Sequence, residues 1–485
     1  MSDVRVPPLD RPQITRHVWA LWGSLWLLFS LAFGLIGTAV LAGSKLFFAT
    51  LIVPVIALAV RRPAVAVMLL LFVLYTRISD VGIEFHGLPS IAQPFVFLLA
   101  IVIFFRRTAA GGSRSLGQHA GLWSAMALYA AVLFASSIWA LDPDAAIKQG
   151  TDLLKNLLIV YIIAEAFDTP QALRLALWSL LAAGVLLATL SIVQAATHTF
   201  GNSYWGLAQA PIRQITVGAN SQRSSGPVGD PNFYALILTA LIPLALSRLI
   251  YERDALLRTM AAVAVVLLVG ALVLTYSRGG LITLVAVVFL YIWLSRVRLT
   301  YVLAVLVLML PLAVFVPASY WQRVSTLASI TPVGAVAARS DASLSDRAGA
   351  GQVALAIFAD HPLGGVGGDN YPVVYFPYAL RLNVPSAATR SHDLYLQVAA
   401  ETGLAGLITF GAVICLALST AWRRFVVACH RGHREVEGLV TSCLISLLAY
   451  LIGSAFLPSA YPRYMWILVG LVIAATLRPP ASEAS

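Results

Sequence analysis

Long apolar runs recur along the 485-residue chain, and short polar segments separate them. The runs are continuous rather than alternating with polar residues, so each predicts a membrane-spanning α-helix and not a strand of a barrel. Because several runs are short, the pattern predicts about 12 to 14 transmembrane helices. The candidate spans are 19–40, 46–60, 63–78, 91–105, 121–140, 153–167, 172–196, 232–250, 257–276, 280–295, 299–317, 396–420, 437–457 and 463–478.

The composition supports the same fold class. Hydrophobic residues make up 60% of the chain and charged residues 11%, whereas soluble domains have about 25% charged residues. We therefore predict an all-α polytopic membrane protein that contacts membrane lipids. The formal net charge of +11 comes from basic residues scattered over short loops, with no basic run that aromatic residues interrupt. This pattern does not favour nucleic acid as a partner.

The polar segments divide the chain into three parts. Residues 1–317 contain transmembrane helices and a shorter polar loop at about 197–231, residues 318–395 form a large polar loop, and residues 396–485 contain the last helices and a short tail. Arginines near the N-terminus and in the short loops place these segments in the cytoplasm by the positive-inside rule. The two long polar loops then lie on the outer face of the membrane.

Several arginines in the outer segments run against this charge bias. Membrane insertion disfavours arginines on the outer face. An anion bound there by several guanidinium groups would explain why these arginines are present. The alternative is that each side chain reaches the lipid headgroups on its own. These residues are Arg213, Arg223, Arg323, Arg339, Arg347, Arg381 and Arg390, with Arg278 and Arg463 at outer helix ends.

Two of these arginines have distinctive neighbours. Arg223 lies in SQRSSGPVGDPNFYA, a glycine- and proline-rich turn whose Asp-Pro-Asn end predicts the start of a helix. Arg278 lies in TYSRGG, where two glycines allow a tight reversal between spans. Since the predicted topology puts both on one face of the membrane, we favour anion binding over contact with headgroups.

The large loop contains a second helical pattern. In SLSDRAGAGQVALAIFADHPLGGVGGDNYP, Ser345 or Asp346 is the expected helix cap, Arg347 lies within the helix, and His361-Pro362 ends it. The following GVGGDN has no surrounding strand–turn–helix unit, and the chain has no GxxxxGK motif. We therefore interpret GVGGDN as a turn and do not expect ATP to be used.

His392 closes the large loop, in TRSHDLYLQVAAETGLAGL. One interpretation is a histidine that caps the following helix at the membrane surface. The other is a general base, because Asp393 or Glu401 could orient the imidazole ring and nearby arginines would lower its pKa and keep it neutral. We favour the general base.

A literal D-x-D occurs in ALDPDAAI, at Asp142 and Asp144. This pattern can hold a divalent ion between the phosphates of a glycosyl donor. Asp-Pro-Asp before an alanine-rich helix is also an ordinary N-cap with proline at the first helical position. We favour the cap and predict no metal or other cofactor.

These motifs together resemble the O-antigen ligase family over most of residues 200–460. The resemblance rests on the loop that closes on a histidine, LYLQVAAETGLAGL after it, HPLGGVGGDNY before it, the S-R-G at a helix end and the R…G…D-P-N segment. It implies a GT-C-like glycosyltransferase of the bacterial inner membrane with its active site facing the periplasm. Such an enzyme moves polysaccharide from undecaprenyl diphosphate to lipid A–core without ATP.

The resemblance also implies residue roles. His392 corresponds to the catalytic histidine, and Arg223, Arg278 and Arg347 are candidates to bind diphosphate. Arg390, Asp393, Tyr395 and Glu401 are candidates for supporting roles; many relatives have Asn or Ser where this chain has Asp393. The implied reaction is an inverting displacement in which a histidine takes the acceptor proton and arginines stabilise the leaving diphosphate, with no metal ion.

Three other functions remain open. An O-antigen polymerase would use the same donor with another glycan as acceptor, and a protein O-oligosaccharyltransferase would use a serine. The chain ends soon after its last span, with LRPPASEAS, and this favours the ligase over the oligosaccharyltransferase. A transporter is a weaker alternative, because the spans carry few charges and polar residues gather in the outer loops.

Overall fold

The computed structural model describes residues 55–216, 219–294, 342–384, 390–457 and 462–477. The chain forms two compact units, 1–61 and 62–485. In the first unit the description covers residues 55–61, which are helical. The predicted spans 19–40 and 299–317 lie outside the described residues.

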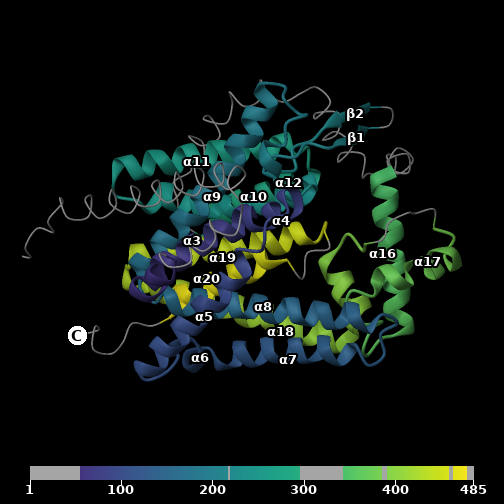
Figure 1. The fold of residues 1–485 in the computed structure, drawn as a ribbon, viewed down its shortest axis with the longest axis horizontal. Helices are drawn as coiled ribbons and strands as arrows, with labels where there is room; N and C mark the ends of the chain where they lie inside the picture. Colours follow the sequence, from purple (N-terminus) through teal and green to yellow (C-terminus); the bar gives the residue numbers. More distant parts are fainter. Residues whose placement is uncertain (1–54, 217–218, 295–341, 385–389, 458–461, 478–485) are drawn as a thin grey trace, which may run out of the picture. The chain divides into compact units, whose positions relative to one another are not determined.

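The second unit is built from helices that run mostly side by side (Figure 1). A two-stranded antiparallel hairpin and one short 3-10 helix, η1, lie between α9 and α10. The helices are α3 (Pro63–Thr76), α4 (Ile78–His86), α5 (Ala92–Ala109), α6 (Arg114–Gln118), α7 (Ala120–Ser136), α8 (Pro143–Ala166), α9 (Pro170–Ala196), η1 (Tyr204–Gly206), α10 (Pro231–Tyr251), α11 (Ala255–Leu274), α12 (Arg278–Leu294), α16 (Ala342–Asp360), α17 (Tyr371–Arg381), α18 (Leu394–Arg431), α19 (Arg434–Ser454) and α20 (Arg463–Thr476).

The predicted fold class is confirmed: the protein is an all-α polytopic membrane protein. In the described part, α5, α9, α10, α11, α18 and α19 are each long and apolar enough to cross a membrane. Helices α3 and α4 form one further candidate, bent by 49° at their junction, and α7, α12 and α20 are shorter apolar helices. The total of 12 to 14 spans stays a prediction, because part of the chain lies outside the described residues.

Aspartates in front of prolines set the start of two helices, as the sequence predicts. The Asp142 carboxylate accepts a hydrogen bond from the Ala145 amide at 3.0 Å, and Pro143 occupies the first turn of α8. The Asp230 carboxylate likewise accepts hydrogen bonds from two amides of the first turn of α10, at 2.7 and 2.8 Å. These contacts satisfy amides that have no partner within the helix.

Two helix boundaries differ from the prediction. Helix α18 continues to Arg431, past the predicted end at residue 420, because no glycine or proline interrupts it between there and Gly432. Gly432 adopts the left-handed conformation, with φ 68°, that commonly ends a helix. Helix α16 begins at Ala342 and not after a cap at Ser345 or Asp346, although it ends at Asp360 beside the predicted His361-Pro362 stop.

Helix α10 is buried along most of its length and packs against α11, α12 and α19. Glycines let these helices approach one another. A Cβ atom on Gly280 of α12 would lie 2.9 Å from the Ala235 Cβ, and one on Gly453 of α19 would lie 2.5 Å from a methyl group of Leu236. The Ala235 Cβ cannot move away without a backbone shift, so the close approach of α12 to α10 depends on Gly280, whereas a larger residue at Gly453 would require the Leu236 side chain to move.

Strands β1 (Ile212–Thr216) and β2 (Ala219–Gln222) form the antiparallel hairpin, which the sequence did not predict. After β2 the chain returns to the helices, where the Ser224 amide donates to the Leu274 carbonyl at the end of α11. Figure 1 shows the hairpin, α16 and α17 at the same end of the helix stack.

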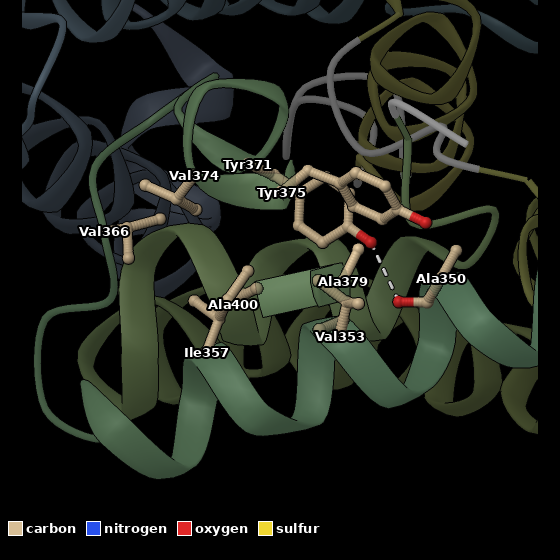
Figure 2. Close-up of a cluster of buried hydrophobic side chains, with 10 residues drawn as sticks. Ala350, Val353, Ile357, Val366, Tyr371, Val374, Tyr375, Ala379 and Ala400 are labelled. Carbon is tan, nitrogen blue, oxygen red and sulfur yellow. Dashed lines mark hydrogen bonds between the residues drawn. The ribbon is translucent and has the colours of Figure 1, made fainter. Parts of the chain in front are cut away.

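Helices α16 and α17 pack against the first part of α18 through a small apolar core (Figure 2). Within it, the Tyr371 hydroxyl donates to the Ala350 carbonyl at 2.8 Å, joining the start of α17 to α16. Ala400 brings α18 into the same core. The core therefore holds the large-loop helices against the segment that begins just after His392.

Helix α18 is interrupted at Gly403, whose φ of 61° and ψ of −156° are accessible only to glycine. The interruption frees backbone groups, and the loop 362–367 uses them. Amides of Val366 and Gly367 donate to the carbonyls of residues 400 and 401, and amides of residues 404 and 405 donate to the carbonyls of residues 362 and 363, at 2.8–3.1 Å. The predicted GVGGDN turn is confirmed, and it fastens the loop to the broken helix.

Candidate active site

A small, partly open pocket, which we call the cleft, lies where α10, α12, α16 and α19 meet. Many of the residues that line it are small. Among the lining residues only Arg347 is charged. The lining consists of Asn232, Leu236, Thr239, Ser277, Gly279, Gly280, Thr283, Arg347, Gly453, Phe456 and Leu457.

His392 lies within electrostatic reach of Arg347, so the structure brings these two predicted site residues together. The pKa of His392 is lowered, first by burial and then by the positive charge of Arg347. The carboxylates of Asp230 and Asp346 oppose this shift, and Arg390 adds to it weakly. A lowered pKa keeps the imidazole neutral at neutral pH, as a general base requires. The sequence predicted the direction from the arginines, but burial is the larger cause.

The backbone of His392 is in the left-handed region, with φ 55°. This conformation costs a residue other than glycine about 1 kcal/mol or more, and such residues gather at functional sites. The next residue, Asp393, is the N-cap of α18. The chain therefore turns sharply at His392 before it enters the helix, and the interpretation of His392 itself as the cap is wrong.

Asp393 does not orient the imidazole, which is a correction to the prediction. Its Oδ1 accepts hydrogen bonds from the amides of Tyr395 and Leu396, both at 2.8 Å. Burial raises the pKa of this carboxyl, and the two backbone hydrogen bonds oppose the rise. Asp393 fixes where α18 begins and acts on His392 only by setting the position of that helix end.

Two further supporting candidates also contact other parts of the protein. The fully buried Glu401 accepts hydrogen bonds from the side-chain amides of Gln149, at 3.2 Å, and Gln397, at 3.3 Å. The Tyr395 hydroxyl donates to the Leu451 carbonyl of α19 at 3.1 Å. These contacts join α18 to α8 and α19, so both residues help to hold the first part of α18 in place.

Arg223 is 4% exposed and connects three segments. Its Nε donates to the Thr275 carbonyl at 2.8 Å, and its Nη2 donates to Oδ1 of Asn232 at 3.0 Å. Thr275 ends α11, and Asn232 lies in the first turn of α10. Arg223 therefore ties the segment after β2 to two helix ends beside the cleft, a positioning role that the sequence did not predict.

Arg278 is the first residue of α12, between Ser277 and Gly279 of the cleft wall. The reversal from α11 to α12 is tight, as predicted, and Tyr276 has a φ of 52°. Ser277 Oγ accepts a hydrogen bond from the Gly280 amide at 3.2 Å, which caps α12. The first turn of α12 thus faces the cleft, and the positive end of a helix dipole favours an anion there.

Arg390 is exposed and lies within electrostatic reach of both His392 and Asp369. Burial raises the pKa of Asp369 and Arg390 opposes this rise, whereas at His392 Arg390 adds to a lowering caused mainly by burial. The D-x-D motif has the predicted capping role at Asp142, described above. In the parts of the chain that the structure describes, no three His, Cys, Asp or Glu side chains gather closely enough to hold a metal ion.

Helices long and apolar enough to cross a membrane define a polytopic membrane protein. Its candidate site is the cleft lined by Arg347, with His392 within electrostatic reach of that arginine. Residues 263–411 match the family model described as O-antigen ligase. This segment of the chain thus carries an O-antigen ligase domain. The matched segment includes Arg278, Arg347, Arg390 and His392, whereas Arg223 and Asn232 precede it. No curated protein gives a significant match to the chain.

Proposed function

We propose that this protein is an O-antigen ligase, which transfers a polysaccharide from undecaprenyl diphosphate to lipid A–core. The match of residues 263–411 to the O-antigen ligase model supports a glycosyltransferase-like enzyme with a lipid-linked glycan and a lipid acceptor as its substrates. The observation that carries the proposal is the position of His392, a half-buried histidine of lowered pKa, beside Arg347 of the cleft.

In the proposed reaction, the neutral imidazole of His392 takes the proton of an acceptor hydroxyl. The acceptor oxygen then attacks the anomeric carbon of the donor sugar, and the bond from this carbon to the phosphate oxygen breaks. Undecaprenyl diphosphate leaves with the bonding electron pair. The attack comes from the face opposite the leaving group, so the configuration at the anomeric carbon inverts.

The leaving diphosphate gains negative charge, which preorganised positive groups stabilise. Arg347 lines the cleft, and Arg278 stands at the start of α12, whose first turn faces it. Arginine suits this task because its planar guanidinium contacts two phosphate oxygens at once. Arg223, whose guanidinium is engaged with Thr275 and Asn232, holds the surrounding helix ends. We propose that the reaction needs no metal ion.

The proposed location is the bacterial inner membrane, with the cleft facing the periplasm. Two observations support this location. The arginines of the short loops follow the positive-inside rule, which supports an outer position for the segments around 197–231 and 342–395. In addition, the hairpin, α16 and α17 lie at one end of the helix stack, so these segments share a face (Figure 1).

The test is transfer by the purified protein in liposomes, with an undecaprenyl-diphosphate-linked oligosaccharide, excess EDTA and one of two acceptors. The proposal predicts that lipid A–core gains the mass of the oligosaccharide. Transfer only to a second lipid-linked oligosaccharide would instead identify a polymerase. Activity lost to EDTA and restored by Mg²⁺ or Mn²⁺ would contradict the metal-free mechanism.

A further inference from the structure

We propose that Asn232 contacts the donor substrate, and that its side-chain Nδ2 group donates a hydrogen bond to a diphosphate oxygen in the cleft. This inference rests on the proposed function, because it names a further residue of the same site. Asn232 lies in the first turn of α10 and lines the cleft beside Ser277 and Gly279 of α12, with Arg347 of α16.

The orientation of the Asn232 amide follows from its contact with Arg223. A guanidinium group has only hydrogen-bond donors, so the atom that Arg223 Nη2 contacts at 3.0 Å must be the carbonyl oxygen of the Asn232 side chain. Arg223 is itself buried and fixed by its bond to the Thr275 carbonyl. The amide therefore cannot flip without losing a hydrogen bond, and its NH₂ group points away from Arg223.

The backbone of Asn232 is also fixed. Its amide N–H donates to Oδ1 of Asp230 at 2.7 Å, as part of the cap of α10. A side chain whose backbone and carbonyl oxygen are both held is preorganised, so little conformational entropy is lost when Nδ2 donates to a ligand. Among the residues that the structure describes, this Nδ2 group donates no hydrogen bond.

Asn370 shows what a structural asparagine looks like in the same chain. Its Oδ1 accepts from the Asp142 amide at 2.7 Å, and its Nδ2 donates to the carbonyls of Asp142 and Gly368, both at 2.9 Å. Asn370 is fully buried and uses both ends of its amide within the protein. Asn232 uses only its oxygen in this way and lies at a cleft wall, which points to a ligand for its nitrogen.

The substitution Asn232→Asp separates a substrate contact from a structural role. Aspartate keeps the oxygen that Arg223 contacts, strengthens that contact through its charge, and suits the first turn of a helix. It replaces only the NH₂ donor, by an oxygen that repels phosphate. If Asn232 merely holds Arg223, this variant keeps its activity. If Nδ2 contacts the diphosphate, the variant folds normally and binds the donor poorly.

The experiment measures Tm, transfer kinetics and equilibrium binding of undecaprenyl diphosphate for Asn232→Asp, Asn232→Ala and the control Asn370→Asp. We expect Asn232→Asp to keep the parental Tm and to weaken binding about 10- to 100-fold, the effect of losing a hydrogen bond to a charged group. Asn232→Ala should weaken binding without adding charge. Asn370→Asp should lower Tm and leave the affinity unchanged.

Parental affinity in either Asn232 variant would overturn the inference. So would a loss of transfer by Asn232→Asp that disappears at about pH 9 while the affinity for the donor stays parental, because the variant would then act by raising the pKa of His392. If Asn232→Asp does not fold, Asn232→Ala decides the question by the same criterion. The binding measurement also distinguishes the two proposals: a parent protein that binds undecaprenyl diphosphate but transfers nothing contradicts the ligase function alone.

Discussion

Two regions of the protein gather the same kinds of charged residue and use them differently. Where α5, α6 and α8 meet, Arg107 Nε lies 2.9 Å from the buried carboxylate of Glu165, and Asp168 lies within 3.1 Å of Arg107 and Arg114. At the cleft, the carboxylates of Asp230 and Asp393 accept hydrogen bonds from helix amides, and Arg223 donates to uncharged oxygens.

The two regions show that the role of an arginine depends on whether carboxylates or uncharged oxygens surround its guanidinium group. In the first region, which we call the clamp, carboxylates neutralise the guanidinium groups and hold helix ends together. In the cleft region Asp230 and Asp393 instead cap helices, and the guanidinium of Arg223 holds backbone and amide oxygens. The clamp thus stabilises the packing of helix ends. In the proposed function, the cleft region binds an anionic substrate.

The largest expected effect in the cleft region comes from His392→Ala. Loss of the general base should lower the rate of transfer about 10²- to 10⁴-fold, while membrane insertion stays normal. The measurement is complementation of a ligase-deficient strain, with protein levels matched by immunoblot. Asp393→Asn is the control, since an asparagine keeps the oxygen that caps α18. Normal polysaccharide-capped lipopolysaccharide from His392→Ala would rule out the general base.

Arg107→Ala should have the largest effect on stability and little on chemistry. It leaves Glu165 buried without its ion-pair partner, which costs about 3–5 kcal/mol. We expect a clear fall in Tm in detergent, together with an unchanged KM for the donor in the folded fraction. A raised KM at unchanged Tm would show that the clamp and the cleft are not separate in function.

Arg347→Ala should raise the KM for the lipid-linked donor about 10-fold or more, because a charge-assisted contact with the diphosphate is lost. Arg347→Lys should give a smaller rise, since lysine keeps the charge and loses the two-point geometry. Steady-state kinetics with varied donor concentration checks both. A parental KM in the alanine variant would remove Arg347 from the donor site.

The smallest expected effect is that of Asp393→Ala. Removing an N-cap costs about 1 kcal/mol, so Tm should fall slightly. Transfer should fall by less than in His392→Ala, because the imidazole remains and only the helix start that positions it loosens. Thermal unfolding and transfer rates measured on the same samples separate these effects. Equal activity loss in the two variants would mean that Asp393 acts directly on the reaction.

The sequence predicted the helical fold because apolar runs of membrane length have few alternative structures. It also predicted features that depend on neighbouring residues, such as the caps at Asp142 and Asp230 and the turn at 364–370. The hairpin and the break at Gly403 were missed. Gly403 has the sequence context of an ordinary helix residue, and its role depends on a loop some 40 positions earlier in the chain reaching the freed backbone groups.

The candidate site could be predicted from the sequence to about the same extent as the fold. The family resemblance proposed His392 and Arg347 as site residues, and the structure brings the two within electrostatic reach of each other. The neighbouring arginines also predicted the direction in which the pKa of His392 is shifted. The sequence indicated Arg223 as a candidate to bind the diphosphate, and Asp393 or Glu401 to orient the imidazole. In the structure Arg223 is bonded to Asn232, and Asp393 is bonded to the α18 amides. Side-chain partners of this kind depend on tertiary packing, which residue spacing does not encode. Asn232 could have been noticed only from its place in the D-P-N segment.

The most direct test of the central claim is the pH dependence of transfer by the reconstituted protein, measured as kcat/KM for the acceptor. The pKa of His392 is lowered from its ordinary value of about 6.5, so the base is neutral and active above that value. We predict a constant rate from about pH 7 upwards and a fall only as the pH drops through the lowered pKa, with no such limb in His392→Ala. A rate that still rises above about pH 7.5, or a limb that persists in His392→Ala, would contradict the role of His392 as the general base.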